Sequence, residues 1–174
     1  MFLYKILDLP QVPNELISQG PMIESYVGWI HKREGRDIFS ADHPLYSISD
    51  NLKDWLTKNI YANYKKIGIK HAIGSDDHPF IGIHTDATRH YVLQYNLDSA
   101  GGLLHYWKEK NQPLIRNQRV NLCDYEQVEL VEKCPIPDKT WHIINTMALH
   151  SVEGITGTRV NIQLSLDHIP EFCG

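Results

Sequence analysis

The stretch HTDATRHYVLQYNLDSAGG, residues 84 to 102, begins with a histidine and an aspartate two positions apart and continues into a strand-like run. In an extended chain, residues i and i+2 point to the same side, so His84 and Asp86 present an imidazole and a carboxylate toward one point. Both groups are common metal ligands. The spacing therefore predicts two ligands of a metal site, with a third to come from another strand.

His150 is the best third candidate among the ten histidines, because it lies just before a turn and a strand that carries Arg159. Two histidines and one carboxylate on one face of a metal leave three coordination positions open, as in non-haem Fe(II) oxygenases. A structural zinc site would close its shell with four protein ligands. A catalytic zinc site stays open as an alternative on these residues alone.

The part of the chain that must position these residues looks like antiparallel β structure. From about residue 66, short extended runs are separated by Gly, Pro, Asn and Asp, without long helical patterns between them. They predict a barrel-like or jelly-roll sandwich. The seven candidate strands are KIGIKHAI, FIGIHTD, YVLQYNL, GLLHYW, EQVELV, WHIINT and RVNIQLSL.

The first third predicts helices instead. Apolar residues recur at helical spacing in residues 21–34, and a second helix is expected to start near Ser49. These helices would cover one face of the sheet. We therefore expect a mainly β fold with N-terminal helices, formed as a single domain over residues 1–174, with mainly helical support over 1–65 and the β core over 66–168.

Two of the candidate strands have one apolar and one polar face. In RVNIQLSL, Arg159, Asn161 and Gln163 alternate with aliphatic residues, and in YVLQYNL, Gln94 and Asn96 share a face. A barrel with helices outside and a polar, ligand-holding interior requires this pattern. Polar faces that simply meet bulk water are the alternative.

The order His84-x-Asp86, then His150, then Arg159 nine positions later resembles the Fe(II)- and 2-oxoglutarate-dependent oxygenases of the double-stranded β-helix fold, a jelly-roll, cupin-like architecture. The resemblance covers about residues 66 to 168. The strand ending YNLD and the pair Gly101-Gly102 are similar to the prolyl-hydroxylase-like branch. The tail LSLDHIPEF is similar to the aspartyl and asparaginyl β-hydroxylase branch, so both branches stay open.

The resemblance implies a ligand set and cosubstrates. His84, Asp86 and His150 would bind Fe(II), and 2-oxoglutarate would chelate the metal, react with O2 and be decarboxylated to succinate and CO2. Arg159 would anchor the far carboxylate of the keto acid, because a guanidinium matches a carboxylate in two parallel hydrogen bonds.

Further cosubstrate contacts follow from the same register. Asn161 lies two residues after Arg159, where relatives often have serine or threonine, and its amide could donate to the same carboxylate. Gln94 and Asn96 are expected to line the pocket, while Tyr95 faces the helices. Arg89 is expected to be exposed at the strand start, with contact to substrate as the lesser alternative.

The expected activity is that of a dioxygenase, most simply a hydroxylase, because Asp86 fills the position that halogenating relatives leave to chloride. The substrate would be a peptide or protein side chain, or a small metabolite. A cupin-like binding protein without turnover and a metal-dependent hydrolase are the alternatives.

Composition limits the remaining partners. The formal net charge is −4 and the basic residues form no run, so no stable nucleic-acid partner is expected. No apolar run approaches 18 residues and the first residues do not form a secretory signal, so we expect a cytoplasmic protein without a membrane partner. The three cysteines match no CxxC spacing and are expected to be reduced.

Overall fold

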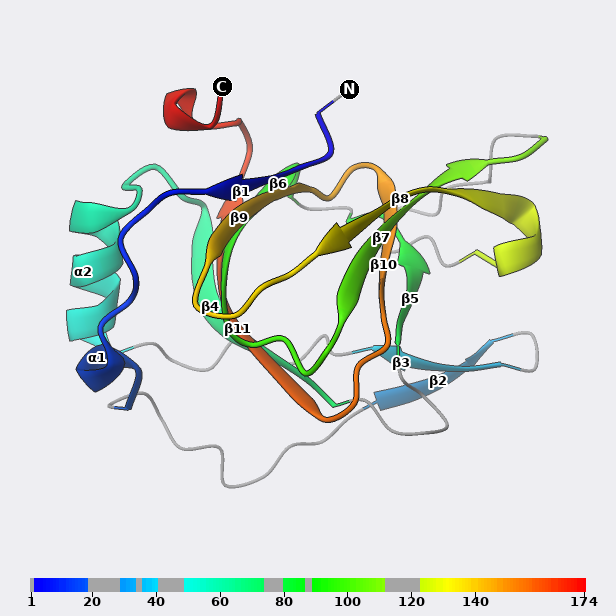
Figure 1. Ribbon diagram of the computed structural model, residues 1–174, viewed down its shortest axis with the longest axis horizontal. Helices are drawn as coiled ribbons and strands as arrows, with labels where there is room; N and C mark the ends of the chain where they lie inside the picture. Colours follow the sequence, from blue (N-terminus) through cyan, green and yellow to red (C-terminus); the bar gives the residue numbers. More distant parts are fainter. Residues whose placement is uncertain are drawn as a thin grey trace.

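A computed structural model describes residues 2–18, 29–33, 36–40, 49–73, 80–86, 89–111 and 123–174. Its strands form two main antiparallel sheets and a separate two-stranded sheet (Figure 1). The larger sheet has the order β1-β9-β6-β11-β4, made of Tyr4–Leu7, Trp141–Asn145, Tyr91–Asp98, Thr158–Leu166 and Lys66–Ile73. The smaller sheet has the order β5-β10-β7-β8, made of Ile81–His84, Leu149–Glu153, Leu103–Glu109 and Val128–Pro135.

The chain winds between the two main sheets. β4 lies in the larger sheet, β5 in the smaller and β6 in the larger; β7 and β8 follow in the smaller sheet, β9 in the larger, β10 in the smaller and β11 in the larger. Each sheet is thus assembled from strands far apart in sequence, which is the winding of the jelly-roll class. It brings β5, β6, β10 and β11, the strands next to or bearing the predicted site residues, around one interior (Figure 1).

Helices α1 (Asn14–Ser18) and α2 (Asp50–Asn59) cover the outer side of the larger sheet (Figure 1). The side chain of Ser49 accepts a hydrogen bond from the Leu52 amide and so caps the start of α2. Leu52 and Leu56 are fully buried against the outward residues of β6, β9 and β11. Two short 3₁₀ helices, Tyr125–Gln127 and Glu171–Cys173, complete the helical elements of the described residues.

Several expectations from the sequence are confirmed and others are not. All seven predicted strands form, and α2 begins where a helix was expected. The predicted helix over 21–34 is wrong for Trp29–Arg33, which pairs as β2 with Arg36–Ser40 (β3), while residues 21–28 lie outside the described residues. A mainly helical first third is therefore not confirmed.

Two strands of the main sheets were not predicted. β1 is a four-residue edge strand with two exposed residues, so it lacks a clear alternation. β10 carries His150 and is largely buried, but polar and apolar residues are mixed on both of its faces, so its sequence LHSVE shows no clear alternation. In the part of the chain that the structure describes, no helix has the length and apolar character needed to cross a membrane.

Candidate metal centre and its pocket

His84, Asp86 and His150 meet at the inner side of the smaller sheet. His84 is the last residue of β5, and β10 pairs with β5 so that His150 stands directly opposite His84. The two imidazole rings are 4.4 Å apart between centroids, and Nε2 of His84 lies 3.7 Å from Oδ1 of Asp86. One potential ligand atom from each of the three residues lies within 4.8 Å of the others.

The two histidines are oriented by their own backbones. Nδ1 of His84 lies 2.6 Å from the carbonyl oxygen of Gly82, and Nδ1 of His150 lies 2.9 Å from that of Ala148. A carbonyl only accepts, so each Nδ1 carries the proton and each Nε2 keeps its lone pair. Metal-bound histidines are held in this way in proteins. The three residues therefore fit a divalent metal with two imidazoles and one carboxylate.

The protonation states of the three residues also favour metal binding. Burial lowers the pKa of His150 to about 3, and burial likewise lowers the pKa of His84, so both rings are neutral at neutral pH. Burial alone would raise the pKa of Asp86, but the charge of Arg89 and the neighbouring histidines hold that pKa well below its usual range. Two neutral imidazoles and an ionised carboxylate are the forms that bind metal.

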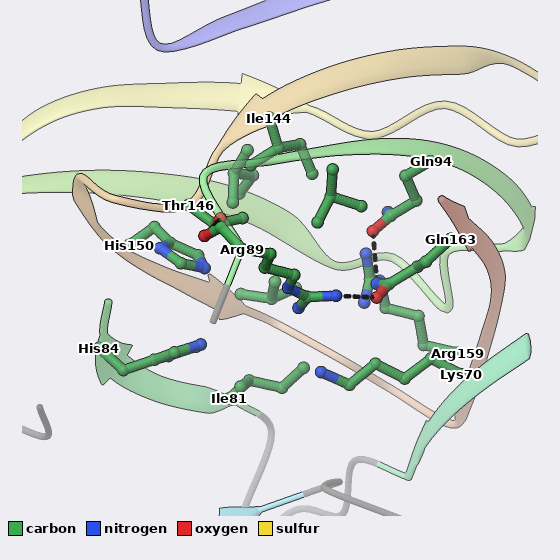
Figure 2. A pocket seen from close by; sticks show the side chains of 13 residues that line it. Lys70, Ile81, His84, Arg89, Gln94, Ile144, Thr146, His150, Arg159 and Gln163 are labelled. Carbon is green, nitrogen blue, oxygen red and sulfur yellow. Dashed lines mark hydrogen bonds between the residues drawn. The ribbon is translucent and has the colours of Figure 1, made fainter. Parts of the chain in front are cut away.

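A pocket that opens to solvent extends from this cluster between the two sheets (Figure 2). His84 and His150 lie at one end and Arg159 and Gln163 toward the other (Figure 2). The remaining lining residues combine aliphatic side chains with a few polar groups: Lys70, Ile81, Arg89, Val92, Gln94, Leu104, Ile144, Thr146 and Val152.

Arg159 is a buried cation. The residue is 3% exposed, and its Nε has no hydrogen-bond partner in the part of the chain that the structure describes. Burial lowers the pKa of Arg159 to about 10, which still leaves it charged at neutral pH. Within the described ranges, no carboxylate lies at ion-pair distance from it. Because an isolated buried charge is costly, this geometry indicates an anion-binding position.

Asn161 adds unpaired groups beside Arg159 on the inner face of β11. The residue is fully buried, and neither the oxygen nor the nitrogen of its side-chain amide has a partner in the described part of the protein. It faces Asn96 across the β6–β11 ladder. Asn96 is itself bonded, since its nitrogen donates to the Ile136 carbonyl.

A chain of hydrogen-bonded amides runs along the same polar layer. Gln163 donates from Nε2 to Oε1 of Gln94, and Gln94 donates from Nε2 to Oδ1 of Asn96. The same Gln94 nitrogen lies 3.0 Å from Nε2 of His142. Burial, and then the charge of Arg159, lower the pKa of His142 to about 3, so this ring is a neutral acceptor.

The structure thus places all the predicted site residues around one interior. Gln94 and Arg159 line the pocket, whereas Asn96 and Asn161 are buried and are not among its lining residues. Tyr95 packs on the helix side, as expected. Arg89 differs from the expectation of exposure, because it lies partly buried in the pocket and pairs with Asp86.

Other residues of the pocket and of the polar layer beside it were missed from the sequence. Gln163 lies on the polar face of β11, so the alternation of polar and apolar residues in the sequence could have identified it. Thr146 lies in a turn, and His142 alternates with buried apolar residues in β9, so neither carried a local signal. Lys70 on β4 lies across from Asn161, and only the β4–β11 register brings it to the pocket.

Comparisons with known proteins show little. No protein-family model and no curated protein sequence matches the chain. An oxidoreductase of the 2OG-Fe(II) oxygenase family from Burkholderia pseudomallei aligns with 89% of this chain and 77% of its own, at 13% identity and a TM-score of 0.46.

Two sugar-nucleotide enzymes are similar at a still lower level. A variant of a 3,4-ketoisomerase from Thermoanaerobacterium thermosaccharolyticum aligns with 98% of this chain and 85% of its own, at 8% identity and a TM-score of 0.41. A dTDP-4-dehydrorhamnose 3,5-epimerase from Elizabethkingia anophelis aligns with 98% and 78%, at 11% identity and a TM-score of 0.34. Similarity at this level does not separate these activities, so a function must be argued from the site.

Proposed function

We propose that this protein is an Fe(II)- and 2-oxoglutarate-dependent dioxygenase of the double-stranded β-helix type, and that it hydroxylates its substrate. The observation that carries the proposal is a three-ligand cluster whose two histidines line one end of a pocket, with a buried cation toward the other end that has no carboxylate partner among the described residues. A metal and a dicarboxylate together would satisfy both ends.

In this proposal Nε2 of His84, Nε2 of His150 and Oδ1 of Asp86 hold the metal. Three protein ligands leave room for a chelating keto acid and for oxygen. When bound, Fe(II) with 2-oxoglutarate and O2 supplies an oxidant for C–H bonds, with decarboxylation of the keto acid to succinate and CO2. The carbonyls of Gly82 and Ala148 keep both rings in the metal-binding tautomer.

Arg159 anchors the carboxylate of the keto acid that lies farther from the metal. A guanidinium can donate two parallel hydrogen bonds to one carboxylate, and burial strengthens the attraction. Nδ2 of Asn161, which has no partner among the described residues, is a further donor on the same face of the strand. An anion therefore satisfies groups that the described protein leaves without partners.

The primary substrate would be a peptide or protein side chain or a small metabolite. A cytoplasmic location, the absence of membrane and nucleic-acid partners, and membership of either hydroxylase branch belong to the same proposal. The aliphatic lining residues Ile81, Val92, Leu104, Ile144 and Val152 supply the apolar part of the cavity, as in most small-molecule sites.

The test is anaerobic addition of Fe(II) and then 2-oxoglutarate to the purified protein. We expect a visible metal-to-ligand charge-transfer band in the wild type. Arg159→Ala should need about 100-fold more keto acid for the same band, since charge-assisted hydrogen bonds are lost. Lys65→Ala, which removes an exposed cation paired with Asp167 at 2.7 Å, is the matched control and should behave as wild type.

Other outcomes separate the alternatives. Folded, metal-loaded protein that shows no band contradicts the cosubstrate role of Arg159. Hydrolytic activity without oxygen or keto acid would then identify a metal-dependent hydrolase. Ligand binding without turnover or oxygen uptake would identify a cupin-like binding protein.

A further inference from the structure

Arg89 ties the predicted ligand Asp86 to the polar wall of the pocket. Its Nε donates to Oδ2 of Asp86, and its Nη1 donates to Oε1 of Gln163 at 2.6 Å. The other oxygen of the same carboxylate, Oδ1, lies 3.7 Å from Nε2 of His84. One oxygen therefore faces the histidine while the other is held by the guanidinium (Figure 2 shows Arg89 reaching toward Gln163).

The partners of Arg89 are themselves fixed in orientation. A guanidinium only donates, so Gln163 must turn its oxygen toward Arg89 and its nitrogen toward Gln94. Gln94 must then accept through its oxygen and donate onward to Asn96. Gln94 and Gln163 are at most 6% exposed, so this wall cannot easily rearrange into water.

The backbone around Arg89 is also held in place. Thr146, which is 2% exposed, accepts at its carbonyl from the Asp86 amide at 2.8 Å. Its hydroxyl donates to the Arg89 carbonyl at 2.9 Å, and its amide donates to the His90 carbonyl at 3.0 Å. The backbones of Asp86 and Arg89 are thus both hydrogen-bonded to the turn that leads into β10 and His150.

We propose that Arg89 is a positioning residue of the metal centre, which holds Oδ2 of Asp86 so that Oδ1 points toward the histidines and serves as the single carboxylate ligand atom. This inference rests on the proposed metal centre and adds to it a residue outside the ligand set. Arg89 acts through Asp86, and Gln163 acts through Arg89.

Two physical effects of Arg89 oppose each other, which makes the inference testable by sign. As a nearby positive charge, Arg89 repels a divalent cation, so its removal would tighten metal binding if charge were its whole role. By fixing the orientation of Asp86, Arg89 positions a metal ligand. Loss of a residue that orients a ligand in this way typically weakens metal affinity by about 10- to 100-fold. The direction of the change therefore identifies the role.

The experiment is a titration of metal-free protein with Co²⁺ under argon, followed by visible absorption. Arg89→Met, which keeps the length of the side chain without its donors, should weaken Co²⁺ binding by about 10- to 100-fold. Arg89→Lys keeps the charge without the planar fork and should fall between that variant and the wild type. Unchanged affinity in Arg89→Lys together with tighter binding in Arg89→Met would overturn the inference.

Further variants control for unfolding of the protein and for failure of the proposed metal centre itself. Gln163→Leu leaves Arg89 and Asp86 in place but removes the anchor of the guanidinium, and should weaken binding by a few-fold. Lys65→Met removes an exposed ion pair with Asp167 and should leave affinity unchanged. Thermal unfolding of each metal-free variant reports the folded fraction.

His84→Ala separates the two levels of the proposal. If wild type binds Co²⁺, His84→Ala does not, and both Arg89→Met and Gln163→Leu bind as wild type, only the role of Arg89 is overturned. If wild type itself fails to bind Co²⁺, or binds it equally in His84→Ala, the metal centre and the role of Arg89 fall together.

Discussion

The outer and inner faces of β11 are buried to nearly the same extent, but the outer face stabilises the fold and the inner face destabilises it. On the outer face, Ile162 and Leu164 are fully buried against the core cluster that includes α2. On the inner face, Arg159, Asn161 and Gln163 are 3%, 0% and 6% exposed. Burial alone therefore does not distinguish the side of the strand that stabilises the fold from the side that would hold a ligand.

The faces differ in how far their buried groups are satisfied. Burying aliphatic side chains contributes about 25 cal/mol per Å² of apolar area. Arg159 Nε and the Asn161 amide are buried without partners in the described part of the protein, which costs free energy, about 1–3 kcal/mol for each neutral polar group. A strand selected for stability alone would be apolar on both faces, so the inner face is best explained by a polar ligand.

The largest effect that separates the two faces of β11 is a dependence of stability on pH, because its outer face carries no titratable side chain. His142 and His150 both have a pKa lowered to about 3, chiefly by burial, from an ordinary value of 6.5. Between these values the unfolded chain binds more protons than the folded one. The stability from keeping these rings neutral is therefore fully present above pH 6.5 and declines as pH falls toward 3.

Each histidine should contribute about 1.4 kcal/mol per pH unit within that window. Urea unfolding of the metal-free protein at pH 7, 6 and 5 measures the slope. His142→Gln keeps an acceptor for Gln94. It should lower the slope of the unfolding free energy against pH by about 1.4 kcal/mol per pH unit, which is the contribution of one proton. A slope identical to that of wild type would show that His142 is not buried as a neutral ring.

On the outer face, Ile162→Ala should lower the free energy of unfolding by about 2–5 kcal/mol, because it leaves a cavity in a fully packed cluster. Urea unfolding at pH 7 measures the loss. The affinity of the folded protein for 2-oxoglutarate should not change. A large loss of affinity without loss of stability would contradict the division between the faces.

On the inner face, Arg159→Met should weaken ligand binding without lowering stability, which is the reverse of the effect of Ile162→Ala. We expect the affinity for 2-oxoglutarate to fall by about 100-fold, or about 2.8 kcal/mol. The free energy of unfolding should stay the same or rise, since a buried charge without a carboxylate partner among the described residues is removed. Calorimetric binding and urea unfolding on the same preparation test both parts, with Lys65→Met as the control for removing a surface cation.

The smallest effect is expected for Asn161→Leu, which replaces an unsatisfied amide with an apolar side chain of similar volume. Stability should rise by about 1–2 kcal/mol, because two buried polar atoms without partners are removed. Binding of 2-oxoglutarate should weaken by no more than about tenfold. Destabilisation of 2 kcal/mol or more would mean that the amide has partners in solution.

Local sequence determined much of this protein. The period-two alternation of β6 and β11 predicted which side is polar, and that side is indeed the interior of the barrel. The i, i+2 spacing of His84 and Asp86 predicted that they share a side, because extended backbone fixes that geometry within three residues. The capping serine and apolar stripe predicted α2 for the same local reason.

Tertiary structure decided the rest, since those features depend on residues far apart in sequence. One exception is local: despite the helical spacing over 21–34, Trp29–Arg33 pairs as a strand with the neighbouring Arg36–Ser40, which provides hydrogen-bond partners along one of its edges. The pairing of β5 with β10 sets His150 against His84. Only this contact turns two separate motifs into one cluster.

The role of Arg89 shows the same limit most clearly. In the sequence it is a charged residue beside a strand start, where exposure is the ordinary outcome. In the fold, Gln163 lies 74 positions away and receives its hydrogen bond, while Thr146 clamps its backbone from another turn. Strand register and packing determine such long-range contacts, and local residue patterns do not predict them.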